Sequence, residues 1–137
     1  NLLDGSEHFA LVKGNLIENK TPRVRVIASN VVKNYLMGEK LPNSFNHTIK
    51  YFKKYKDCVL VFIRDTNLKS VSETLKAYKD KKFYASGSDK LIKNYGIGAQ
   101  IIKSLKIRNM ILVTRSKKKV IALQGYGIKI IKQEIIK

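Results

Sequence analysis

The residues best suited to bind an anion lie at 114–119, which read Thr-Arg-Ser-Lys-Lys-Lys. This stretch follows an apolar run at 109–113 that predicts a buried strand, and Ser116 can cap a short helix that would begin there. Hydroxyl groups, cations and the free N–H groups of a helix N-terminus suit a phosphate at the carboxyl end of a strand. A solvated basic turn would have the same composition, and the local sequence favours neither interpretation.

Other reactive groups lack the partners that catalysis or metal binding needs. His8 precedes a predicted strand, His47 lies early in a predicted helix, and no G-x-S-x-G motif surrounds a serine, so both histidines are interpreted as surface or structural residues. Gly96 and Gly98 lie inside a predicted helix, without the third glycine of a dinucleotide-binding loop. Cys58 lies in an apolar run without a neighbour at metal-ligand spacing. The chain therefore lacks enough ligands for a zinc active site.

Strands and helices alternate along the chain and would position these groups. Apolar patterning predicts strands at 9–14, 22–28, 58–63, 109–114 and 128–136. Helical spacing predicts helices from Ser44 to about 56, at 68–78, from Ser88 or Asp89 to about 105, and between Ser116 and Gly125. Loops are expected at 30–42, 65–67 and 79–88, with a short strand at 83–85 within the last. The order predicts a single α/β domain over 1–137, with helices packed on a mixed, largely parallel sheet.

The net charge of +18 raises the question of nucleic-acid binding. Lysine outnumbers arginine 23 to 5 and is spread along the whole chain, whereas nucleic-acid binders tend to use arginine for bidentate contacts. The composition therefore favours a positive field that attracts an anionic small molecule over a dedicated nucleic-acid surface.

Cysteine usage and hydropathy restrict the compartment. One cysteine excludes an internal disulfide framework and fits a reducing compartment such as the cytoplasm. No stretch approaches the ~18 apolar residues of a membrane span. Because the chain begins at Asn1 without a methionine, we expect further residues before it.

Several motifs resemble one enzyme family. Residues 94–102 (Asn-Tyr-Gly-Ile-Gly-Ala-Gln-Ile-Ile), the strand and basic turn at 110–119, and 123–128 (Leu-Gln-Gly-Tyr-Gly-Ile) have the order and spacing of DYGIGAQIL, LLTNNPKK and LEGYGL in GTP cyclohydrolase II. Upstream, 8–14 resembles the family's H-x-A-L-V-x-G, and Arg25-Val26 resembles the start of its RVHSEC motif. The resemblance is strong after Asp89 and thin between 28 and 76, and the family's first strands have no counterpart.

The resemblance implies a specific chemistry. Members of the family open the imidazole ring of GTP and release formate and pyrophosphate, as the first committed step toward riboflavin. A zinc ion held by three cysteines activates the attacking water. An arginine attacks the α-phosphate, an aspartate is the general base, and magnesium assists release of pyrophosphate. The resemblance also implies a homodimer.

The chain departs from the family at the catalytic positions. Asn30 stands where the first zinc cysteine belongs, and the paired cysteines have no counterpart in 31–45. A glycine-free stretch at 65–68 replaces the phosphate-binding QEGRGIGL loop. Leu91 occupies the position of the aspartate and Lys93 that of the arginine. We therefore expect no metal cofactor, neither zinc nor magnesium.

Other family positions are retained. Arg25, Thr114 and Lys119 match positions that contact the nucleotide, and we expect them to bind GTP or another phosphate ligand. Tyr78 matches the family's tyrosine, but neither it nor Lys93 is assigned a catalytic role. Thr114 and Lys119 are not expected to fill a core, so a ligand would explain them. The favoured interpretation is a catalytically degenerate family member. An active enzyme completed by another chain or segment, and a basic nucleic-acid or interaction module, are the alternatives.

Overall fold

The structure is a computed structural model that describes residues 5–18, 20–29, 42–64, 69–80, 87–117 and 121–136. Its strands are β1 (Phe9–Lys13), β2 (Arg23–Ser29), β3 (Cys58–Arg64), β4 (Asn109–Thr114) and β5 (Lys129–Ile135). Its helices are α1 (Pro42–Phe52), α2 (Ser70–Lys79), α3 (Gly87–Ser104) and α4 (Ile121–Gln124). None of these helices is long and apolar enough to cross a membrane.

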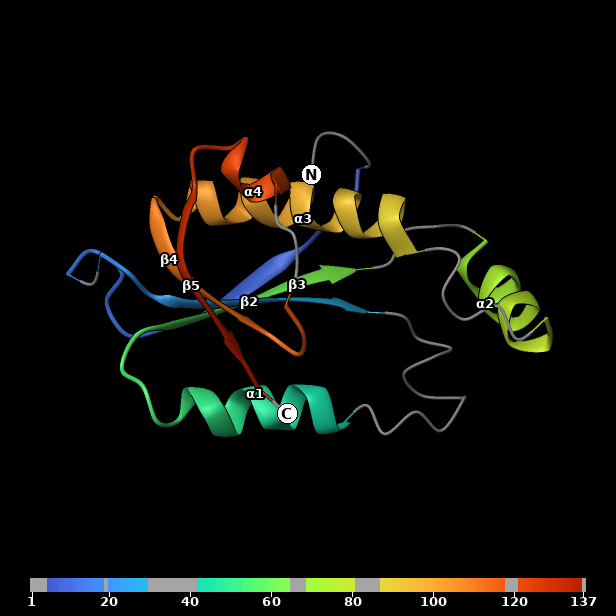
Figure 1. Ribbon diagram of the computed structural model, residues 1–137, viewed down its shortest axis with the longest axis horizontal. Helices are drawn as coiled ribbons and strands as arrows, with labels where there is room; N and C mark the ends of the chain where they lie inside the picture. The colour runs from blue at the N-terminus through green and yellow to red at the C-terminus, as the bar shows by residue number, and fades with distance from the viewer. Residues whose placement is uncertain are drawn as a thin grey trace.

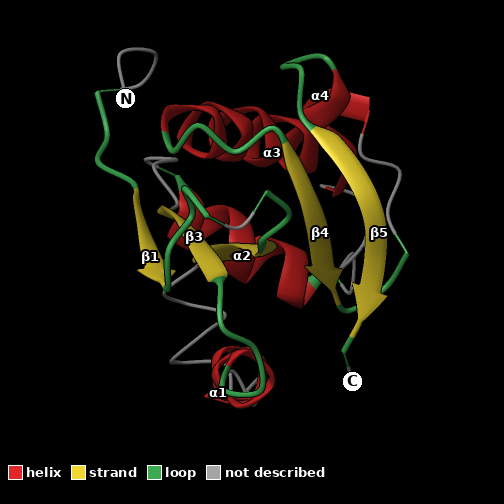
Figure 2. Cartoon of the chain, turned by 90° about the vertical axis from the view of Figure 1, so that its left-hand side faces the viewer, coloured by secondary structure: helices red, strands yellow, loops and turns green. Residues whose placement is uncertain are grey.

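The strands form one mixed sheet in the order β1-β3-β2-β4-β5. β1 runs antiparallel to β3, and the other three pairs of neighbours are parallel. α3 and α4 cover one face of the sheet and α1 covers the other (Figure 1 and Figure 2). In Figure 1, α2 stands to the right of the sheet, beyond the tip of β3. The predicted α/β fold with a largely parallel sheet is confirmed.

Apolar side chains fill both faces of the sheet, because successive residues of a strand point to opposite sides. The α3 face is packed by Val24, Val59, Val61, Ile63, Met110 and Leu112 from the strands, with Ala99, Ile102 and Leu123 from the helices. The α1 face is packed by Cys58, Leu60, Val113 and Phe52. Cys58 is 1% exposed and its Sγ lies 3.8 Å from the carbonyl oxygen of Phe52, so its prediction as a buried hydrophobe is confirmed.

Gly98 lets α3 pack closely on the sheet. A Cβ at this position would lie 3.3 and 3.4 Å from the two methyl groups of Val26 on β2. At Gly96, the nearest atom to an added Cβ is the hydroxyl of Tyr126, at 4.0 Å. Close packing is therefore found at Gly98, where α3 crosses the central strand.

The limits predicted for α1 were wrong at both ends. The helix begins at Pro42 and ends at Phe52, not at Ser44 and about 56. Proline suits a first helical turn because its φ is fixed and no N–H is needed there. At the other end, the Nζ of Lys13 donates to the carbonyl oxygens of Phe52 and Tyr55, at 2.9 and 2.6 Å. A cation from β1 thus satisfies the last carbonyls, which the local sequence could not reveal.

The helix predicted to begin at Ser116 was also wrong. Residues 115–117 are not helical, and α4 is a single turn that begins at Ile121. Consecutive lysines are unfavourable in a first helical turn, because the helix dipole places partial positive charge there. The helix N-terminus expected to hold a phosphate is therefore not present at Ser116.

The remaining boundaries agree closely with prediction. α2 begins at Ser70, and α3 begins at Gly87, one residue before the predicted cap. α3 ends at Ser104, and Lys106 follows with a φ of 60°. Residues 30–41, 65–68 and 81–86 lie outside the described residues, and they include most of the loops predicted at 30–42, 65–67 and 79–88 and the short strand predicted at 83–85.

Candidate functional site

The sheet changes its direction of winding between β2 and β4. The chain leaves β2 for α1 and then β3 on one side, and it leaves β4 for α4 and then β5 on the other. α1 connects β2 to β3, and α3 directly precedes β4. These two helices lie on opposite faces of the sheet (Figure 1). In open α/β sheets, ligands bind outside the carboxyl ends of the strands at such a switch point. The carboxyl ends of β2 and β4 are therefore the expected position of a ligand-binding site.

The paired part of β2 and β4 is short. Arg23 pairs with Ile111 and Val24 with Leu112. Arg25 and Thr114 both follow the paired segment, on neighbouring strands, and they are two of the residues predicted to bind a nucleotide. The structure therefore places these two predicted residues on neighbouring strands, just beyond the point where β2 and β4 stop pairing.

Arg25 is an arginine buried in the centre of the sheet, only 5% exposed. Among the described residues, its Nε and Nη1 atoms find no hydrogen-bond partner, although the side chain keeps another interaction. Burial lowers the pKa of Arg25, the positive charge of nearby Arg115 lowers this pKa further, and Tyr95 partly offsets both. The protein thus holds a desolvated cation next to a second cation, an arrangement that an anion would stabilise.

Thr114 ends β4 and is 6% exposed. Its Oγ1 is buried and has no hydrogen-bond partner among the described residues. The backbone of Thr114 is held in place, because its carbonyl oxygen accepts a hydrogen bond of 2.9 Å from the N–H of Ile136. The expectation that Thr114 lies outside the packed interior was wrong. Its hydroxyl nevertheless remains available to a ligand. Because burial of a hydroxyl without a hydrogen-bond partner is costly, a ligand that accepts its proton would offset that cost.

Tyr95 is a site residue that the sequence did not single out. It lies on α3, is 9% exposed, and interacts electrostatically with Arg25. Burial raises the pKa of Tyr95, and the charge of Arg25 lowers it in part, so the phenol stays protonated at neutral pH. The position of Tyr95 at helical spacing predicted only packing in the core. A buried tyrosine usually finds a hydrogen-bond partner for its hydroxyl, and that requirement was the signal in the sequence that could have identified Tyr95 as a candidate site residue.

The other predicted site residues are only partly placed. Lys93 lies in α3, two residues before Tyr95, and Tyr78 lies in α2. The side chains of Lys93 and Tyr78 are outside the described part of the chain, as is Lys119 altogether. Their predicted roles stay predictions.

The donor set does not fit the family's zinc site. The sequence contains one cysteine, and Cys58 is buried at the start of β3 with its thiol against a backbone carbonyl. Within the described ranges, no group of three or more His, Cys, Asp or Glu side chains is placed to hold a metal ion. Asn30, at the position of the first zinc ligand, lies outside these ranges. A zinc ion held by three cysteines of this chain is therefore excluded by composition.

The two histidines do not approach this site. The Nδ1 of His8 accepts a hydrogen bond of 3.0 Å from the N–H of Arg64, and its Nε2 lies 2.7 Å from the Oγ of Ser6. His8 thus joins the segment before β1 to the end of β3, in agreement with a structural role. His47 is exposed on α1, as expected of a surface residue.

Comparison with known proteins agrees with this arrangement. Residues 1–135 match the family model of GTP cyclohydrolase II. The chain is 29% identical over 133 residues to the monofunctional riboflavin biosynthesis protein RIBA 2, chloroplastic, of Arabidopsis thaliana, which covers 94% of this chain and 28% of that protein. It is 30% identical over 142 residues to the riboflavin biosynthesis protein RibBA of Bacillus subtilis, covering 95% of this chain and 36% of the relative.

The RibBA protein of Aquifex aeolicus is 28% identical over 149 residues, covering 98% of this chain and 36% of the relative. The chain thus spans between 28% and 36% of the length of these three curated relatives. The family match, in contrast, extends over nearly the whole chain. The protein belongs to the GTP cyclohydrolase II family of riboflavin biosynthesis.

Proposed function

We propose that this domain binds a guanine nucleotide or a related phosphate ligand between the carboxyl ends of β2 and β4, and that it does not open the ring of GTP. The observation that carries the proposal is the buried Oγ1 of Thr114, which lacks a hydrogen-bond partner and lies at the switch point of the sheet. A phosphate oxygen would accept its proton. Arg25 and Arg115 would supply positive charge, and the phenol of Tyr95 would supply a second neutral donor.

Electrostatics support an anion at this place. A buried arginine with a depressed pKa is destabilised in its charged form, and a phosphate would reverse this effect. Arg25 remains protonated at neutral pH, so a phosphate could bind it without uptake of a proton. The net charge of +18 would raise the local concentration of anions around the molecule.

The proposed loss of catalysis rests on the residue types. Family chemistry uses three zinc cysteines, an aspartate and an arginine. The chain has one cysteine, with Leu91 and Lys93 at the aspartate and arginine positions. No water-activating metal can be held by three thiolates of this chain. The domain would therefore serve as a nucleotide-binding relative of the enzymes, in the cytoplasm and as a homodimer.

A second candidate is an active enzyme completed by another segment or chain. It is favoured by one observation, that the chain spans only about a third of its relatives' length. The zinc content of the purified protein and the release of formate from GTP distinguish the two candidates. Stoichiometric zinc together with turnover would establish the second candidate and refute the first.

Thermal stability against a panel of nucleotides tests the binding site. A ligand that binds only the folded state raises the melting temperature as its concentration exceeds its Kd. GTP should stabilise the wild type, and Thr114→Val combined with Lys119→Ala should abolish this effect while the fold remains intact. Each charge-assisted phosphate contact contributes about 1.5–3 kcal/mol, so loss of Lys119 alone should weaken binding roughly ten- to a hundredfold.

Lys103→Ala is a suitable charge control, since Lys103 is exposed in the last turn of α3, away from the start of the helix. This variant should respond to GTP as the wild type does. If the wild type and the double variant bind GTP equally, or if no nucleotide stabilises either, the proposed site is wrong.

A further inference from the structure

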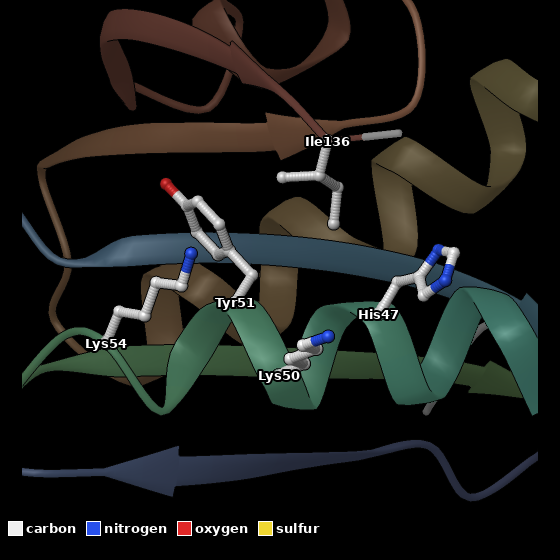
Figure 3. Close-up of a pocket in the computed structure, with 5 residues that line it drawn as sticks. All are labelled: His47, Lys50, Tyr51, Lys54 and Ile136. Atoms are coloured by element: carbon white, nitrogen blue, oxygen red, sulfur yellow. The ribbon is translucent and has the colours of Figure 1, made fainter.

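A second set of hydrogen-bond donors lies on the α1 face of the sheet, beside the end of β5. A pocket of about 300 Å³ is lined by His47, Lys50, Tyr51 and Lys54 of the α1 segment and by Ile136 after β5. In Figure 3, Tyr51 and His47 rise from α1 on the side of Ile136, Lys50 lies in front of the helix between them, and Lys54 extends from the turn that follows the helix. A volume of this size is at the lower end of the range for small-molecule sites. This pocket is separate from the residues assigned to the nucleotide.

The polar lining residues come from α1 and from the turn that follows it. His47 and Lys50 are three residues apart on the helix and are therefore neighbours on its surface. Lys54 lies in the turn beyond Phe52, the last residue of the helix. Among the described residues that line the pocket, none is acidic. The lining therefore presents two cations and an imidazole, from separate positions, to one ligand.

Tyr51 adds a donor whose direction is fixed by a neighbour. Its hydroxyl oxygen accepts a hydrogen bond of 3.2 Å from the Nε of Arg23, which leaves its own proton for another acceptor. Arg23 is itself held, with its guanidinium 3.5 Å from the ring centre of Tyr55 and its Nη2 3.5 Å from the Oε1 of Glu134. The hydroxyl of Tyr51 is thus oriented before a ligand arrives.

Glu134, two residues before Ile136, does not oppose an anion. Glu134 interacts with Arg23 and with Lys132, both at 3.5 Å, so its charge is balanced by two cations. The ammonium groups of Lys50 and Lys54 form no ion pair with the described carboxylates. The pocket consequently combines two available ammonium groups, a hydroxyl donor and the apolar wall of Ile136.

The geometry points to a binding site for a small anion with two or more linked phosphate groups in the pocket between α1 and the end of β5. Lys50 and Lys54 would each contact phosphate oxygens, and Tyr51 would donate to one of them. A chain of phosphates reaches donors on α1 and on the turn that follows it better than a single carboxylate does. The site would share no lining residue with the proposed nucleotide site.

Calorimetric titration with inorganic tripolyphosphate tests this site in the intact chain. Lys50→Gln combined with Lys54→Gln should weaken binding about tenfold or more, because two charge-assisted contacts are lost. The matched control is Lys53→Gln with Lys56→Gln, which removes the same charge from exposed positions that do not line the pocket. This control should change the Kd by less than about threefold, as expected for screened surface charges.

Two further variants separate the outcomes. Tyr51→Phe should weaken binding without a change of charge, as loss of the hydroxyl donor requires. In a Thr114→Val, Lys119→Ala background, which removes the proposed nucleotide site, tripolyphosphate should still bind at this pocket and should still be weakened by the substitutions at Lys50 and Lys54. Equal weakening by the two lysine pairs would show attraction to general positive charge and overturn the proposal. Absence of binding to the wild type, or loss of binding only in the Thr114 variant, would overturn it as well.

Discussion

At the scale of single residues, Arg25 is a charged group that the protein buries within the sheet. A buried charge is tolerated when its surroundings compensate for the loss of water, and here burial and Arg115 both act against the charged form. Within the described residues, two guanidinium nitrogens and the Oγ1 of Thr114 are left without a hydrogen bond. Such groups are expensive in a purely structural core. Their presence at a switch point is what favours binding of a ligand over packing.

Lys93 provides a test at the position of the family's arginine nucleophile. A lysine can attract an α-phosphate, but it lacks the bidentate fork of a guanidinium. We expect Lys93→Ala to weaken nucleotide binding only modestly, by less than about tenfold. Titration of GTP into wild type and variant measures this ratio. Complete loss of binding would give Lys93 a central role that the proposal does not include.

Cys58 predicts an alkaline loss of stability. Burial raises the pKa of its thiol, with smaller opposing effects of Lys13 and Arg23 and a smaller raising effect of Asp57. The pKa of this thiol is therefore higher in the folded than in the unfolded state. Below the pKa of the unfolded state the stabilising effect of the neutral thiol is complete, and it is lost as the pH rises through the pKa of the folded state. The free energy of unfolding should therefore fall from about pH 8.5 upward.

Urea unfolding at pH 7 and at about pH 9.5 measures this fall. Cys58→Ala should be less stable than the wild type at pH 7, because it leaves a small cavity, but should lose less stability on going to the higher pH. If both proteins lose the same amount, the thiol is not the titrating group.

At the scale of elements, the packing of α3 on β2 decides where the site can form. Gly98 allows the helix to approach Val26, and this approach brings Tyr95, one turn earlier, to the carboxyl end of the sheet. β2 is also the strand that carries Arg25. A change in the distance between α3 and β2 should consequently affect both stability and the site.

Alanine substitution at the two glycines tests this contact. Gly→Ala in a helix interior is favourable by about 1 kcal/mol when space is available. Gly96→Ala should raise the melting temperature, because its Cβ would meet only the hydroxyl of Tyr126 at 4.0 Å. Gly98→Ala should gain less or be destabilised, since its Cβ would press on Val26 at 3.3 Å. Equal stabilisation of both variants in thermal melts would show that α3 can shift without cost.

At the scale of the whole molecule, composition sets what the domain can bind. The charge of +18 belongs to a chain with 28 basic and 10 acidic side chains. In such a field, anions are attracted to many places, but only pockets with oriented donors should hold them specifically. The two proposed sites lie on different parts of the molecule, and their separate variants distinguish specific binding from this general attraction.

Metal dependence is a property of the whole chain and can be tested directly. With a single buried cysteine, the folded protein should contain no stoichiometric zinc. Its melting temperature should accordingly be unchanged in the presence of a strong chelator. Elemental analysis and thermal melts with and without chelator measure both quantities. A loss of several degrees in the chelator would mean that a structural metal had been overlooked.

The sequence by itself determined the fold class, most element boundaries and the family. The strand at 109–114 and the buried run after Cys58 were readable because apolar residues in a short segment leave little choice but a sheet interior. The retained positions Arg25 and Thr114 came from the resemblance, and the loss of zinc ligands came from counting cysteines. These are local or compositional properties, and no tertiary contact is needed to see them.

The tertiary structure decided what depends on residues far apart in the chain. Lys13 ends α1 at Phe52 through contacts about 40 positions away in sequence, which periodicity cannot reveal. Tyr95 became a site residue only because α3 lies across β2, and a helical pattern cannot distinguish a core tyrosine from one beside a buried arginine. The pocket next to Tyr51 likewise joins α1 to the end of β5. Local pattern selects the elements, whereas the order of strands in the sheet selects which side chains meet.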